Sequence, residues 1–136
     1  MPELNRPLPR PTAFSEEFWR AASEQHLVHP WCERCARAFF PPQYCCPGCL
    51  EADWGWREST GRGELYSWTV VHRAPLPGFE VPYVIGVVDL DEEGFVMMSN
   101  VVNVDLDQLR IGLPLRVCWA SVGDVQLPMF EPDGSA

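Results

Sequence analysis

Two pairs of cysteines carry the clearest chemistry in this sequence of 136 residues. Cys32 and Cys35 are separated by two residues, Cys46 and Cys49 are separated likewise, and ten residues lie between the pairs. Each pair presents two thiolates from one tight turn, and a tetrahedral metal ion needs four soft donors from two such turns. The spacing therefore predicts a four-thiolate metal site formed by Cys32, Cys35, Cys46 and Cys49.

The neighbouring Cys45 competes with Cys46 for one ligand position. We favour Cys46 because it repeats the two-residue spacing to Cys49, whereas Cys45 leaves three residues. A disulfide framework is the alternative, but the N-terminus has no apolar signal segment, which predicts a cytoplasmic protein with reduced thiols. Zinc is favoured over iron because it is the common ion of such sites. Four protein ligands leave no open position, so the zinc is expected to be structural.

The remaining residues form no recognisable catalytic arrangement. His26, His29 and His72 lie in no motif with a nucleophile or a metal pair. Cys118 falls in a predicted strand, where it is most simply a small apolar residue. The chain has no lysine, which excludes Schiff-base chemistry and a P-loop lysine within it. We therefore expect no independent catalysis by this chain.

The charge balance disfavours a nucleic-acid-binding protein. The net charge is −9, with 10 arginines against 19 carboxylates, and such a chain is poorly suited to neutralise phosphates. No apolar run is long enough to predict a transmembrane helix, so no membrane association is expected. The length suits one modest domain, or a small ribbon joined to a domain of roughly 70 to 80 residues.

A proline-rich arm and a short helix are predicted before the cysteines. Residues 1–12 contain four prolines, which favours an extended arm. A helix should follow, with Ser15 as its N-cap, Phe14 packing on Trp19, and an end near His26. Its apolar stripe docks either on the protein's own core or, together with the arm, on another subunit. The stripe consists of Phe18, Trp19, Ala22 and Leu27.

The second half of the chain predicts a mainly β domain. Runs rich in aromatic and β-branched residues occur at 65–72, 83–90, 95–102, 115–120 and 125–129. One helical turn at 105–110 lies between the third and fourth runs, as in a five-stranded OB-fold barrel, although a five-stranded sandwich would give the same runs. The predicted domains are the arm and helix at 1–26, a zinc ribbon at 27–60 and the OB-fold at 61–136. The loop 75–82, with Phe79 at its middle, is a candidate recognition loop.

Taken together, these features resemble a family of proteins that join a rubredoxin-like zinc ribbon to an OB-fold, long described as a domain of unknown function and associated with acyl-CoA enzymes. The resemblance spans nearly the whole chain. Its landmarks are Phe18-Trp19, the cysteine pairs flanking Phe40-Pro41-Pro42, the segment 61–73, Pro82-Tyr83, and the segments 111–114 and 127–130.

The resemblance implies an accessory subunit in a hetero-oligomer. Its implied partner is a thiolase-like enzyme, such as a lipid-transfer-type aldolase of steroid side-chain degradation, or a hot-dog-fold enoyl-CoA hydratase. A standalone module that binds acyl-CoA or lipid is the alternative, and a nucleic-acid-binding ribbon protein is the third hypothesis. Guanidinium groups suit the phosphates of a CoA thioester, and aromatic side chains could shape an acyl channel or pack the core. The candidate contact residues are Phe14, Phe18, Trp19, Arg37, Phe40, Arg73, Phe79 and Tyr83.

The chain departs from the family pattern at several positions. Ala36 and Leu50 stand where the family usually has glycine after each cysteine pair. Gln43 replaces a common arginine after the double proline, and the predicted hairpin at 91–95 is more acidic than usual. The glycine replacements put the family's ribbon geometry in question for this chain, and the Gln43 replacement puts a phosphate contact from that position in question. The acidic hairpin suggests a neighbour that differs from the usual one of the family.

Overall fold

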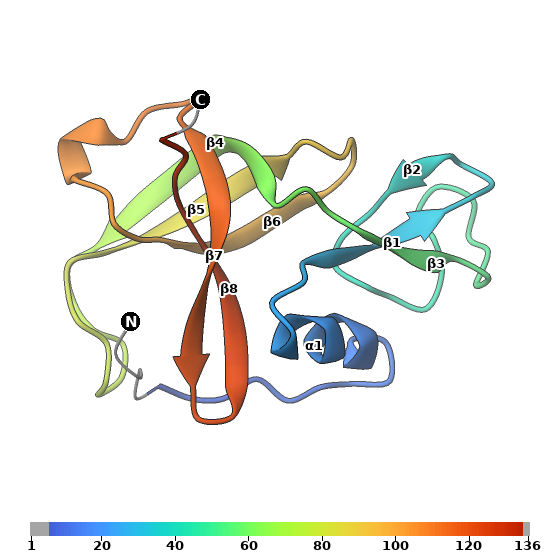
Figure 1. Ribbon diagram of the computed structural model, residues 1–136, viewed down its shortest axis with the longest axis horizontal. Helices are drawn as coiled ribbons and strands as arrows, with labels where there is room; N and C mark the ends of the chain where they lie inside the picture. The colour runs from blue at the N-terminus through green and yellow to red at the C-terminus, as the bar shows by residue number, and fades with distance from the viewer. Residues whose placement is uncertain (1–5, 135–136) are drawn as a thin grey trace.

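The computed structural model describes residues 6–134, in which a small sheet and a closed barrel lie side by side with a helix below them (Figure 1). The elements are α1 (Glu16–Ser23), β1 (Val28–Cys32), β2 (Arg37–Ala38), β3 (Gly55–Glu58), β4 (Arg62–Val71), β5 (Tyr83–Leu90), β6 (Val96–Val101), the 3₁₀ turn η1 (Leu106–Gln108), β7 (Pro114–Val122) and β8 (Val125–Pro132). The predicted mainly β class is confirmed. No helix in the described part of the chain is long and apolar enough to cross a membrane.

The five strands predicted for the second half close into a barrel with the order β4-β5-β6-β8-β7. All neighbours are antiparallel except β6 and β8, which run parallel where Val101 meets Phe130. The predicted helical turn is η1, between the third and fourth barrel strands. These features confirm the OB-fold. The first barrel strand begins at Arg62, three residues before the prediction, because Arg62 to Glu64 pair with β7.

The ribbon is a three-stranded sheet with β1 at its centre. The sequence did not predict β3, which pairs antiparallel with residues 28–31 of β1. The apolar residues between the cysteine pairs favour a strand in sequence, but β2 ends at Ala38. Pro41 and Pro42 have no N–H groups to donate to a neighbouring strand, so the ladder cannot continue through them.

The helix ends three residues before the predicted His26. Gln25 has a φ of 61°, in the left-handed region that stops a helix. Its N–H donates to the carbonyl of Ala22 at 2.8 Å, and the N–H of His26 donates to the carbonyl of Ala21 at 3.0 Å. This is the hydrogen-bond pattern of a Schellman motif, which satisfies the last carbonyls and turns the chain into β1.

Ser15 is the N-cap residue of α1, as predicted, but its side chain makes no capping hydrogen bond. Ser15 has φ −110° and ψ −1°, and its hydroxyl accepts no hydrogen bond from the helix. Instead, the hydroxyl oxygen accepts the N–H of Thr12 at 2.8 Å, which stabilises the turn before the helix. The ring of Phe14 lies 6.1 Å from that of Tyr44, on the ribbon loop.

The apolar side of α1 packs on the protein's own core. Phe18 is buried, and its ring lies 5.6 Å from that of Phe40 on the ribbon. Ala21 joins the same core, which continues through Leu27 into the barrel interior at Phe130. Of the two docking hypotheses for the helix, packing on its own chain is therefore the one that the structure supports.

The ribbon and the barrel meet at the hairpin that joins β5 to β6. The carbonyl of Glu93 in this hairpin accepts the N–H of Ala38 on β2 at 3.3 Å. The carboxylate of Glu92 accepts the hydroxyl of Ser59 and the N–H of Thr60, which lie just before β4. Glu92, one of the acidic residues of this hairpin, thus makes its contacts within the chain. The ring of Phe95 then packs between the ribbon and the barrel core.

We predict that Gly94→Ala weakens this junction more than Gly112→Ala weakens the barrel. Both glycines have positive φ values, 92° and 87°, so alanine costs each variant about 1 kcal/mol of backbone strain. Only Gly94 lies against a neighbour, because its added Cβ would collide with the carbonyl oxygen of Ala38, while nothing lies within 4 Å of a Cβ at Gly112.

Overpacking at Gly94 should therefore lower the free energy of unfolding by roughly a further 1 to 3 kcal/mol. Urea denaturation of the zinc-loaded variants measures the difference. Equal losses for the two variants would contradict the close approach of the hairpin to β2.

Candidate functional site

The four predicted cysteine ligands lie together at one end of the ribbon. Their sulfur atoms are all within 4.8 Å of one another. Cys32 ends β1, Cys35 lies in the turn to β2, and Cys46 and Cys49 lie in the loop before β3. The described part of the chain contains no other such group of metal-binding side chains, and Cys45 is not a member of it.

The distances between the sulfur atoms fit a tetrahedral zinc ion. A zinc–sulfur bond of about 2.3 Å in a tetrahedron places two sulfurs about 3.8 Å apart. The sulfur of Cys32 lies 3.6 Å from that of Cys49, and the sulfur of Cys46 lies 3.9 Å from that of Cys35. A zinc ion held by these four thiolates would have no position left for a substrate or a water molecule, so its role would be structural.

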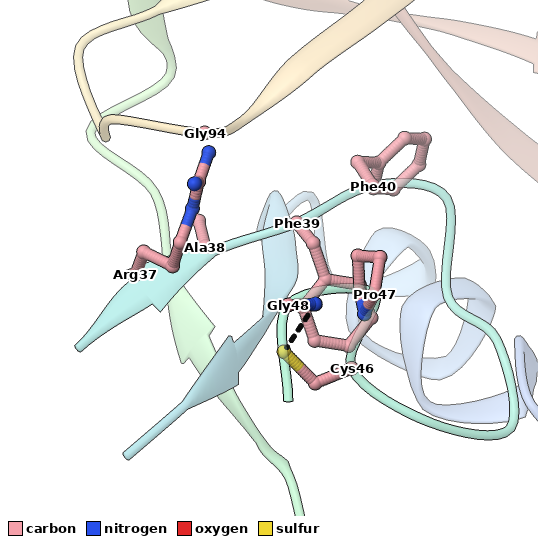
Figure 2. Close-up of a pocket in the computed structure, with 8 residues that line it drawn as sticks. All are labelled: Arg37, Ala38, Phe39, Phe40, Cys46, Pro47, Gly48 and Gly94. Atoms are coloured by element: carbon pink, nitrogen blue, oxygen red, sulfur yellow. Dashed lines mark hydrogen bonds between the residues drawn. The ribbon is translucent and has the colours of Figure 1, made fainter. Parts of the chain in front are cut away.

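The backbone around the second pair prepares Cys46 for metal binding. Burial acts to raise the pKa of this thiol, but the N–H groups of Cys49 and Gly48, together with the thiols of Cys32 and Cys35, lower the pKa to about 7. The N–H of Gly48 donates to the sulfur of Cys46 at 3.3 Å (Figure 2). A Cβ at Gly48 would lie 3.1 Å from the sulfur of Cys35, so glycine at this position lets the two pairs approach without crowding.

The thiol of Cys35 in the first pair has the opposite electrostatic bias to that of Cys46. Burial and the neighbouring sulfurs raise the pKa of Cys35 to about 12 in the absence of a cation. Gathering four thiolates in one place is unfavourable unless a cation compensates their charges. The cluster therefore needs its metal ion in order to hold four deprotonated thiols.

A pocket of about 370 Å³ lies between this cluster and the barrel hairpin. Figure 2 shows the side chain of Arg37 extending from β2 towards Gly94, with Phe39 and Pro47 on the other side of the pocket. Within residues 6–134 the guanidinium group of Arg37 makes no ion pair. Of the predicted contact residues, Arg37 and Phe40 line this pocket, and their contact with a CoA thioester stays a prediction.

The other predicted contact residues are distributed over three places. Phe14 is exposed beside the ribbon loop, whereas the ring of Trp19 packs on that of Phe18 at 5.0 Å in the core region. The rings of Phe79 and Tyr83 stack at 5.6 Å in and after the loop between β4 and β5. Arg73 is exposed at the start of that loop. The structure thus brings Phe18, Trp19 and Phe40 together, and Phe79 with Tyr83, but not the whole set.

The N-terminal arm contacts this loop, and the sequence analysis did not predict the contact. We call it the clasp, and it consists of Arg6, Phe79 and Asn100. The guanidinium of Arg6 lies over the ring of Phe79, 4.7 Å from its centroid. It also donates to the side-chain oxygen of Asn100 on β6 at 3.0 Å. The arm crosses the β7–β8 hairpin near its tip to reach the loop (Figure 1), and the side chain of Leu8 lies close to Gly123 at that tip. The arm has no periodic apolar pattern, so nothing in its sequence indicates this contact.

The histidines and Cys118 do not form a catalytic site. His26 is exposed and pairs with Glu58 at 2.6 Å, and the Nδ1 of buried His29 is 2.9 Å from the carbonyl of Pro30. His72 is exposed at the end of β4. Burial raises the pKa of Cys118 to about 11, which favours the protonated thiol at neutral pH.

The sequence matches two family descriptions along its length. Residues 19–55 match "ChsH2, rubredoxin-like zinc ribbon domain", and residues 56–120 match "ChsH2, C-terminal OB-fold domain". A "DUF35 domain-containing scaffold protein" of Methanocaldococcus jannaschii is 30% identical over 108 residues, which cover 76% of this chain and 75% of that protein. The chain belongs to the DUF35 family.

Two further relatives of this DUF35 protein have names that refer to enzymes. The "Probable enoyl-CoA hydratase alpha subunit" of Thermomonospora curvata is 36% identical over 132 residues, 96% of this chain. The chain spans only 41% of the length of that relative. A solved structure titled "Ltp2-ChsH2(DUF35) aldolase" contains a chain with a TM-score of 0.83 and 35% identity, covering 92% of this chain and 98% of that one.

Two residues of this DUF35 protein stand where the family usually has glycine, and both adopt a left-handed backbone conformation. Ala36 and Leu50 each follow a cysteine pair, and their φ values are 52° and 65°. The left-handed region favours glycine because it has no Cβ, which explains why the family usually has glycine at both positions. The turn after the second pair is closed by the N–H of Leu50, which donates to the carbonyl of Cys46 at 2.8 Å.

We predict that Cys46→Ser abolishes stoichiometric zinc binding, whereas Cys45→Ser does not. Cys46 is one of the four clustered sulfurs and Cys45 is not. Loss of a ligand should also unfold the ribbon, since the metal supplies much of the folding free energy of such modules. Zinc content of the purified variants and their thermal unfolding measure both effects. Equal zinc content in the two variants would contradict the ligand set.

A second prediction concerns the clasp. Arg6→Ala should increase hydrogen exchange of the backbone amides in the loop 73–82, because it removes the cation over Phe79 and the bond to Asn100. A loss of roughly 1 kcal/mol corresponds to exchange about five-fold faster. Arg10→Ala is the matched control, since Arg10 is an exposed arginine of the same arm. Unchanged exchange in the Arg6 variant would show that the clasp does not hold the loop.

Proposed function

We propose that this DUF35 protein is a non-catalytic accessory subunit that binds and supports a thiolase-like acyl-CoA enzyme. The observation that carries the proposal is its similarity, over 98% of the matched chain, to a component of the "Ltp2-ChsH2(DUF35) aldolase" structure. The names of the hydratase alpha subunit and the scaffold protein also support a role in an assembly.

The chemistry of the chain supports an accessory role. A four-thiolate zinc site has no open position, so the metal would stabilise the ribbon rather than activate a substrate. Neither the histidines nor Cys118 provide a nucleophile paired with a base in the described residues. The chain's own residues would therefore act by holding the ribbon, the arm and the loop after β4 in positions that a partner can bind.

The finer proposal is that the complex cleaves or forms a carbon–carbon bond in a β-hydroxyacyl-CoA or β-ketoacyl-CoA, as in retro-aldol degradation of a steroid side chain. In that complex the pocket beside Arg37 would contribute to the path of the acyl-CoA. Two features support this assignment. The guanidinium of Arg37 makes no ion pair within residues 6–134, and phosphates pair with guanidinium groups. Phe39 forms an aromatic wall of the pocket, and acyl or pantetheine segments pack on apolar surfaces.

Co-expression tests the proposal. We expect the zinc-loaded chain to co-purify with the Ltp2 aldolase subunit of the similar complex, and the aldolase activity to depend on both chains. The Cys46→Ser variant is the control for a folded ribbon and should lose both effects. An aldolase subunit that is equally stable and active alone would contradict the proposal. Tight binding of acyl-CoA by the isolated chain, without a stable complex, would instead favour the standalone module.

A further inference from the structure

The outward face of the first three barrel strands carries an apolar patch next to two carboxylates. In the strand register, Glu64 lies opposite Asp89, which lies opposite Val96 on the other side. In the next row, Ser67 lies opposite Val87, which lies opposite Met98. Tyr66 is the extra residue where the register shifts between Leu65 and Ser67. We call this the outer barrel face, formed by Glu64, Tyr66, Ser67, Val87, Asp89, Val96 and Met98.

The chain itself covers the adjoining half of the same strands. Asn100 on β6 is held by Arg6 of the arm, and Tyr83 on β5 is stacked by Phe79 of the loop. The outer barrel face has no such cover in the described residues: Tyr66 is 64% exposed and Met98 is 68% exposed. Large apolar side chains gathered on adjacent strands are unfavourable in water and commonly mark an interaction site.

The two carboxylates indicate the charge of the missing neighbour. Glu64 and Asp89 lie directly opposite each other on β4 and β5, an arrangement of like charges that destabilises a sheet. Neither carboxylate makes an ion pair or a side-chain hydrogen bond within residues 6–134. The nearby Arg62 is paired with Asp133 at 3.6 Å. A basic side chain from a neighbour would relieve the repulsion.

We propose that the outer barrel face binds the catalytic subunit of the complex, through an apolar patch on that subunit with an arginine or lysine at its border. This inference rests on the proposed function and assigns the surface that performs it. A second copy of this chain fits less well. The face carries two carboxylates and no cation, so a two-fold contact would bring four carboxylates together without compensation.

Substitutions on the face should weaken the complex with the Ltp2 subunit without unfolding the chain. We expect Met98→Glu, which places a charge in the apolar patch, to raise the dissociation constant at least 100-fold. Ile111→Glu is the matched control because Ile111 is 75% exposed but lies in the turn before β7, off the face. It should bind like the wild type. Zinc content and circular dichroism verify the fold of each variant.

A neutralising substitution separates binding from stability. Asp89→Asn removes the repulsion with Glu64, so the isolated variant should unfold at a higher denaturant concentration than the wild type. The same variant should bind the catalytic subunit about ten-fold more weakly and with a smaller dependence on salt, because a cross-interface ion pair is lost. A merely structural role of Asp89 would not change stability and binding in opposite directions.

The possible outcomes separate the proposed function from the assignment of the outer barrel face. If the wild-type chain forms no complex, the proposed function fails, and the outer barrel face loses its assigned occupant. If the wild type binds and the Met98 and Asp89 variants bind equally well, only the assignment of the face is overturned. If sedimentation shows a wild-type dimer that Met98→Glu dissociates, the occupant is a second copy, which also overturns the proposal.

Discussion

The ribbon depends on a cation that compensates the charges of four thiolates. Its own buried cluster consists only of Cys32, Phe39 and Cys46, with Trp54 packed against it, and two of these three residues belong to the metal site. So small a core cannot offset the conformational entropy of ordering the two cysteine turns. The metal ion therefore closes the turns, and the turns then direct Phe40 towards the helix and the barrel. The cysteines act on function through this packing and not through chemistry at the metal.

The barrel continues the core that the ribbon begins. The ring of Phe95, which begins the third strand run of the barrel, lies 5.0 Å from His29 on the ribbon and 5.1 Å from Phe40. The hairpin before it approaches β2 so closely that Gly94 has no room for a side chain. The shared core and the backbone contact at this hairpin hold the ribbon packed against the barrel. The division of the chain at residue 60 remains a sequence-based prediction, and apolar contacts cross it.

The sequence was most informative where chemistry restricts spacing or where alternation is regular. The distance between Cys32 and Cys35 must match a tight turn, and the run from Tyr83 to Leu90 alternates buried and half-buried residues as an antiparallel strand does. It was least informative where a tertiary contact decides the structure. The strand around Trp56 is defined by pairing with β1, and the clasp of Arg6 joins residues far apart in the chain. Neither leaves a periodic pattern.

Local rules also failed where two of them competed. Ser15 has the residue type of a helix cap, but its hydroxyl is taken by the turn at Thr12. The helical pattern continues to His26, yet Gln25 adopts a left-handed φ because the chain must turn into β1. Ala36 and Leu50 adopt the same region without being glycines. At these positions the energy of the surrounding packing and of metal binding outweighs about 1 kcal/mol of backbone preference, which a reading of single residues does not include.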